Sequence, residues 1–328
     1  MSTYTLSDLY NECLAQNQWF YDRSFNIEIL GDSNECFGCL KQLLENRKKD
    51  DFRLYNGFFK GNQEHLKSRA QHILSCYILG KILCDNSPAI KEAVNEFIKT
   101  HHFDKVTGIK FSVRYIWMLI CLFHDLGYVY ESQGIYKQDN VQELIENLSD
   151  EVPGIPVGYT KDLLKSYDNY RNCRFAVTDH GIIGGVTLYD DLNKHFSGRS
   201  SLDDNRKKLH SCVSWVIACH NLFVGGSENR CYPCKALNAL ISDGKSRNIK
   251  LQDHPLLYLF DLVDSIEPMK LFGDTEILSE ISVSFSGKSI SFNLDKLCDE
   301  KKQQYARKIQ DLNNWLTDVD EDLTIQLL

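Results

Sequence analysis

The sequence predicts an all-α protein with a small β-hairpin near its C-terminus. Apolar residues recur at three- and four-residue spacing along most of the chain, which is the period of an amphipathic helix. Only 6 of the 328 residues are proline, the residue that most strongly interrupts a helix. Alternation of apolar and polar residues, which is typical of strands, occurs only around residues 277–292.

The expected helices begin with an amphipathic stretch that carries Leu6, Leu9 and Cys13 on one face. A later helix is nearly all apolar and ends at Gly127, a residue type that commonly terminates helices. The loop over residues 224–234 is rich in glycine and polar residues. The expected helices cover residues 6–14, 39–44, 63–84, 111–126, 161–170, 180–192, 207–220, 255–266 and 296–316.

The hairpin is expected where Ile281, Val283 and Phe285 alternate with polar residues, and where Ile290 and Phe292 do so after Ser-Gly-Lys. The chain is long enough for one large domain or two modest ones. We expect three parts, which are a helical extension over residues 1–60, a helical core domain over 61–275, and a hairpin plus helix over 276–328.

Composition and charge exclude several classes of protein. Hydrophobic residues make up 43% and charged residues 25%, as in ordinary globular domains, so the chain is neither disordered nor fibrous. The net charge of −8 argues against binding long nucleic acids or anionic membranes, because both need a cationic surface. The longest apolar stretch, Phe111 to Phe123, is shorter than the ~20 residues of a membrane span.

The N-terminal residues and the 12 cysteines predict a cytoplasmic protein. The first thirty residues contain four acidic residues and lack the apolar segment of a signal peptide. Thiols stay reduced in the cytoplasm, so cysteines there serve as small apolar residues or as metal ligands. Two C-x-x-C pairs, Cys36/Cys39 and Cys231/Cys234, could share a structural zinc ion, although their separation makes this the less favoured interpretation.

Six ionisable residues lie on five expected helices at places where a core is expected. Burying an imidazole or a carboxylate costs free energy unless the group is paired or bound to a metal. One such residue is more often hydrogen-bonded than metal-bound. Six of them are explained together by a metal centre, because imidazole nitrogens and carboxylates are ligands of divalent transition metals. These residues are His72, His124, Asp125, His180, His220 and Asp264.

This pattern resembles the HD superfamily of metal-dependent phosphohydrolases. The family's order is His, His-Asp, His, His and Asp, and here it stands in RAQHILSCYILG, CLFHDLGYVY, DHGIIGGVTLYD, WVIACHNLF and LLYLFDLVDSIEP. The resemblance covers roughly residues 60–270. It implies that residues 61–275 form an all-helical metal-binding domain, which uses one or two divalent ions to hydrolyse phosphate esters.

The resemblance also implies how the ligands are divided. A first ion would be held by His72, His124, Asp125 and Asp264, and Asp125 would bridge to a second ion held by His180 and His220. The two additional histidines favour the binuclear form, with divalent metal ions drawn from Mn, Fe, Co, Ni, Mg or Zn. Asp125 and His124 would be the catalytic pair, and a metal-activated hydroxide would attack the phosphate without a protein nucleophile.

Two neighbouring aspartates leave alternatives open. Asp261 lies about one helical turn before Asp264 and competes with it for the ligand position; alignment with the family's motif favours Asp264. Asp179 precedes His180 and is either a helix cap or a partner of that histidine.

A phosphate substrate needs positive charge near the metals, and several residues could supply it. The cations have a competing interpretation as solvated surface residues. Many family members carry a lysine after the Leu-Gly, whereas this chain has a tyrosine, whose ring could stack on a base. The candidate substrate-binding residues are Arg69, Lys110, Arg114, Tyr128 and Lys270.

We therefore expect a cytoplasmic enzyme that hydrolyses a small phosphate mono- or diester, with a nucleotide as the favoured substrate. No membrane or long nucleic acid is expected as a partner, and homo-oligomer formation stays open. The alternatives are a metal- or nucleotide-binding sensor module without turnover, an HD-type nuclease, and a di-iron oxygenase that uses the same ligands.

Overall fold

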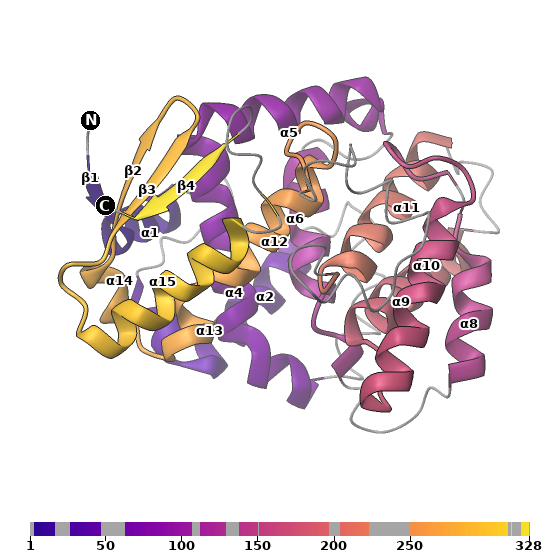
Figure 1. The fold of residues 1–328 in the computed structure, drawn as a ribbon, viewed down its shortest axis with the longest axis horizontal. Helices are drawn as coiled ribbons and strands as arrows, with labels where there is room; N and C mark the ends of the chain where they lie inside the picture. Colours follow the sequence, from indigo (N-terminus) through magenta and orange to yellow (C-terminus); the bar gives the residue numbers. More distant parts are fainter. Residues whose placement is uncertain are drawn as a thin grey trace. The chain divides into compact units, whose positions relative to one another are not determined.

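The described residues are mostly helical, with one small sheet (Figure 1), which confirms the all-α fold with a hairpin near the C-terminus. They form two compact units: unit 1 is Met1–Ala93 with Leu262–Leu328, and unit 2 is Val94–Asp261. The expected division at residues 60 and 275 stays a prediction. This computed structural model describes residues 3–16, 27–46, 63–106, 112–128, 138–149, 151–196, 204–222, 249–313, 316 and 323–327.

Unit 1 contains the long helix α4 (Gln63–Asn86), which the sequence pattern predicted over residues 63–84. Helices α1 (Leu6–Ala15) and α2 (Ser33–Asn46) pack against it. The buried hydroxyls of Tyr10 and Ser75 lie 3.0 Å apart and tie α1 to α4. The other helical elements of this unit are η1 (Ile27–Gly31), α13 (Pro268–Phe272), α14 (Ile277–Glu280) and α15 (Asp299–Asn313).

The sheet of unit 1 has the strand order β1-β2-β3-β4. The expected hairpin is formed by β2 (Ser282–Ser286) and β3 (Ser289–Asn293), which pair antiparallel. Gly287 occupies the turn with a φ of +52°, a conformation that glycine adopts without strain. The sequence pattern did not show β1 (Thr3–Thr5), antiparallel to β2, or β4 (Thr324–Leu327), parallel to β3, because such short strands carry too little alternation.

Unit 2 is a helical assembly in which α10 contacts three other helices. It packs against α6, α8 and α11, and α9 packs against α8 and α11 (Figure 1). α10 is a continuous helix although it contains glycines. A Cβ on Gly184 would lie 2.8 Å from the carbonyl oxygen of Phe123, so glycine at this position allows α10 to approach the end of α6 closely. The elements are η2 (Phe103–Lys105), α6 (Ser112–Phe123), α8 (Gln138–Asn147), α9 (Tyr159–Phe175), α10 (His180–Phe196) and α11 (Asp204–Cys219).

Two helices carry the chain across the unit boundaries. α5 (Pro88–Thr100) passes from unit 1 to unit 2, and α12 (Pro255–Ile266) returns the chain to unit 1. Among the helices that the structure describes, none has the length and apolar character that crossing a membrane requires.

Candidate metal-binding groups

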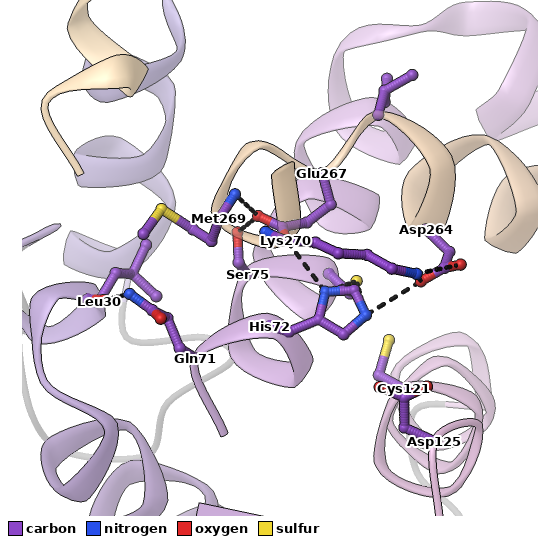
Figure 2. Close-up of polar contacts among 12 residues, drawn as sticks. Leu30, Gln71, His72, Ser75, Cys121, Asp125, Asp264, Glu267, Met269 and Lys270 are labelled. Atoms are coloured by element: carbon purple, nitrogen blue, oxygen red, sulfur yellow. Dashed lines mark hydrogen bonds and ion pairs between the residues drawn. The ribbon is translucent and has the colours of Figure 1, made fainter. Parts of the chain in front are cut away.

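The first candidate group lies in unit 1 around His72, a buried residue in the interior of α4. Its Nε2 lies 3.0 Å from Oδ1 of Asp264 on α12. Its Nδ1 lies 3.0 Å from Oε2 of Glu267, which follows the end of α12 (Figure 2). The Sγ of Cys76, one turn later on α4, lies 3.5 Å from Nδ1. We call His72, Cys76, Asp264 and Glu267 the His72 group.

The groups around His72 favour a positive charge on its imidazole ring. Burial by itself lowers the pKa of His72, but hydrogen bonds with Asp264, Cys76 and Glu267 raise it, and the net pKa lies well above the ordinary value. Burial raises the pKa of the Cys76 thiol to about 12, so this sulfur is a neutral thiol at physiological pH. Asp264 and Glu267 attract this positive charge, and a divalent ion bound at Nε2 would take the place of the second ring proton.

Lys270 places a second cation at the His72 group. Its Nζ lies 2.8 Å from each carboxylate oxygen of Asp264 (Figure 2). The Lys270 side chain is 40% exposed, whereas that of Asp264 is 14% exposed. The carboxylate of Asp264 thus faces both an imidazole and an ammonium group, which shows that cations are attracted to this position.

The second candidate group lies in unit 2, where three helix ends meet. Asp125 follows α6 by two residues, His180 begins α10, and His220 follows α11. One ligand atom from each of these buried residues lies within 4.8 Å of the other two. We call Asp125, His180 and His220, together with the adjacent His124, the Asp125 group. The sequence pattern predicted that these residues converge.

Backbone carbonyls orient two imidazoles of the Asp125 group. Nδ1 of His124 lies 2.8 Å from the carbonyl oxygen of Cys121, and Nδ1 of His220 lies 2.7 Å from that of Ile217. The last carbonyls of a helix lack intrahelical partners, so α6 and α11 offer these acceptors at their C-terminal ends. A carbonyl can only accept, so Nδ1 carries a proton and Nε2 is the ring nitrogen left for another partner. In His124 that Nε2 lies 3.3 Å from Oδ1 of Asp125.

Asp179 caps α10, as one of the two sequence interpretations proposed. Its Oδ1 accepts from the backbone N–H of Gly181 at 2.9 Å. The amide nitrogen of Asn221 lies 3.3 Å from the same oxygen and 3.1 Å from Nε2 of His180. Asp179 thus also contacts His180 indirectly, through Asn221. The sequence offered no signal for Asn221 except its place next to His220.

Tyr128 lies against the Asp125 group. Its ring stacks on His180 with the ring centroids 3.6 Å apart and the planes 17° from parallel. The tyrosine therefore covers one face of this imidazole. Its role as a substrate contact stays a prediction.

The remaining predicted residues lie at several places. Asp264 contacts His72, whereas the competing Asp261 is buried in unit 2. Arg69 and Arg114 are half-buried on α4 and α6. Lys110 and the pair Cys231/Cys234 lie outside the described residues. Cys36 and Cys39 are buried on α2, where the Cys36 thiol donates to the carbonyl oxygen of Ile29 at 3.0 Å.

The donor sets of both groups fit metal ions. Neutral imidazole nitrogens and carboxylate oxygens are the ligands that divalent transition metals take from proteins. Three donors within 4.8 Å of one another, as in Asp125, His180 and His220, match the span of a single coordination sphere. The buried groups could therefore hold metal ions.

Comparisons with protein-family models, curated proteins and solved structures gave no match for this chain.

Proposed function

We propose that this protein is a metal-dependent phosphohydrolase that cleaves a small phosphate mono- or diester, with a nucleotide as the favoured substrate. The observation that carries the proposal is the convergence of Asp125, His180 and His220 from three helix ends. Their order along the chain is the order that the resemblance to HD phosphohydrolases requires. The proposal includes a cytoplasmic location, which the sequence analysis favours.

The proposed ligands follow the resemblance. Within unit 2, Asp125, His180 and His220 would hold one divalent ion, and within unit 1, His72 and Asp264 would contribute ligands to another. The carbonyl contacts of His124 and His220 support this assignment, because they leave Nε2 of each ring as the donor atom. When bound, two divalent ions would polarise the phosphoryl group and lower the pKa of a water molecule.

The chain's own residues would position and neutralise the substrate. Lys270 is 40% exposed and holds its ammonium group at Asp264, so it can turn toward a phosphate oxygen that approaches this carboxylate. A charge-assisted contact of this kind is among the stronger hydrogen bonds in proteins. Asp125 and His124 would be the catalytic pair, as the resemblance implies.

The test combines metal analysis with a substrate panel. The full chain is purified, analysed for bound metal, loaded with Mn²⁺, Co²⁺, Ni²⁺ or Fe²⁺, and offered nucleoside monophosphates, triphosphates and cyclic nucleotides. We expect bound metal and release of phosphate or nucleoside that stops when a chelator is added. Metal at well below one ion per chain, together with no metal-dependent cleavage of any substrate, would sink the proposal.

One observation favours a second function, a metal- or nucleotide-binding module without turnover. Tyr128 stacks on His180 at the position where many HD phosphohydrolases carry a lysine. Loss of that cation removes a phosphate contact or proton donor. Tight nucleotide binding by the fully metallated protein, without any product, would identify this module.

A further inference from the structure

Glu267 is a fully buried carboxylate, at 0% exposure, that receives four hydrogen bonds. The hydroxyl of Ser75 donates to Oε1, and the backbone N–H of Met269 donates to the same oxygen at 2.6 Å. The backbone N–H of Lys270 lies 2.7 Å from Oε2, and Nδ1 of His72 lies 3.0 Å from that oxygen (Figure 2). The sequence analysis assigned no role to this residue.

Three of the four donors fix the carboxylate without help from His72. Glu267 is the N-cap of α13, so two of its hydrogen bonds come from the first turn of that helix. The third comes from Ser75, on the turn of α4 that follows His72. All three of these donors use the carboxylate oxygens as acceptors, so Nδ1 of His72 supplies the proton of the fourth hydrogen bond.

The position of His72 in its helix explains why a carboxylate is needed. His124 and His220 follow helix ends, where free carbonyls accept their Nδ1 protons. His72 lies in the interior of α4, where each carbonyl is already engaged by the N–H four residues later. An acceptor for its Nδ1 must therefore come from another segment, and Glu267 supplies it.

We propose that Glu267 is the positioning residue of His72: it holds the Nδ1 proton and thereby presents Nε2, beside Asp264, as a metal-ligand atom. This inference rests on the proposed metal binding, though not on hydrolysis. A carboxylate behind a ligating imidazole fixes the ring and makes it a better donor. Glu267 itself touches neither substrate nor metal in this arrangement.

A double-mutant cycle on zinc affinity tests the proposal. Competition with a fluorescent chelator is measured on the full chain for wild type, Glu267→Gln, His72→Gln and the double variant. We expect Glu267→Gln to weaken the His72-dependent zinc affinity by about 10–100-fold, the usual effect of losing such a supporting group. Because Glu267 acts through His72, the same change in the His72→Gln background should cause no further loss.

Two further variants separate positioning from packing. Glu267→Asp keeps a carboxylate and should recover part of the lost affinity. Ser75→Ala removes one donor to Glu267 but leaves the contact with His72, so zinc affinity should stay near that of wild type. A Ser75→Ala loss as large as that of Glu267→Gln, or equal losses from Glu267→Gln with and without His72, would overturn the proposal.

A measurement on the unaltered chain remains decisive where a variant does not fold. Nitrogen-15 NMR of the histidine rings in the zinc-loaded protein distinguishes metal-bound from protonated nitrogens. We expect His72, assigned by comparison with His72→Gln, to bind through Nε2 and to keep a proton on Nδ1. Zinc on Nδ1 would refute the role of Glu267 while leaving the proposed function intact; a wild-type chain that binds neither zinc nor any of Mn²⁺, Co²⁺, Ni²⁺ and Fe²⁺ would refute both.

Discussion

Gly185 of α10 and Ser214 of α11 lie in backbone contact: a Cβ on Gly185 would stand 2.3 Å from the carbonyl oxygen of Ser214. The same added atom would stand only 2.9 Å from the Cβ of Ala218. Real Cβ atoms do not approach a carbonyl oxygen so closely, so any side chain at this position pushes the two helices apart. These are the helices that bring His180 and His220 together.

Gly185→Ala is expected to lower the free energy of unfolding by about 1–3 kcal/mol, because it overpacks this contact. Gly38→Ala is the matched control, since Gly38 is exposed on α2 with nothing within 4 Å of its added Cβ. The control should leave stability unchanged or raise it by up to about 1 kcal/mol, owing to the better helix propensity of alanine. Urea unfolding followed by circular dichroism measures both, and a Gly185→Ala protein as stable as wild type would contradict the contact.

Asp125→Asn is expected to remove metal binding by the Asp125 group, because the amide is a neutral and weaker ligand than the carboxylate. The loss of affinity should exceed about 100-fold, the upper range for residues that only support a ligand. Asp168→Asn is the control: Asp168 is also buried in unit 2, but it accepts a hydrogen bond from the side-chain amide of Gln142 at 2.6 Å. Calorimetric titration with Mn²⁺ decides, and equal losses in both variants would count against the assignment.

Lys270→Met is expected to reduce kcat/KM for a phosphate ester by about 10–100-fold, which corresponds to the loss of one charge-assisted hydrogen bond. Metal affinity should not fall, because the removed ammonium competes for the oxygens of Asp264. Lys302→Met is the control: Lys302 is similarly exposed and pairs with Asp295 at 2.9 Å within the same unit. Unchanged kinetics with Lys270→Met would remove this residue from the substrate contacts.

The burial of His210 predicts that the stability of the fold depends on pH, independently of the metal-binding groups. Burial, and secondarily the charge of Arg206, lowers its pKa from 6.5 to about 3. Between these values the unfolded chain binds a proton that the folded chain does not. The part of the free energy of unfolding that depends on the neutral His210 ring is therefore complete above pH 6.5 and is lost as the pH falls below that value.

The measurement compares unfolding free energies of wild type and His210→Gln from pH 7.5 to pH 4. Below pH 6.5 the wild-type curve should fall more steeply, by up to about 1.4 kcal/mol for each pH unit. Above pH 7 the two slopes should coincide, which is the internal control. Equal slopes throughout the range would show that folding does not lower the pKa of His210.

The sequence predicted most of the long helices because their apolar periodicity is local and long, but it missed α5 and α8. It also identified most members of the two groups, since imidazoles and carboxylates on apolar helices are conspicuous. Glu267 escaped notice because an acid before a proline is typical of an ordinary helix start, and its contact with His72 spans 195 residues. β1 was missed because it is only 3 residues long and its partner strand lies near the other end of the chain.

The pairing of β1 with β2 has a consequence for the order of folding during synthesis. The residues of unit 2 are continuous in the chain and emerge from the ribosome together, so that unit can form early. Unit 1 cannot complete its packing until residue 262 and those after it have been translated, although its first 93 residues are made much earlier. During that interval the apolar face of α4 lacks its later partners, which makes the nascent chain a natural client for chaperones.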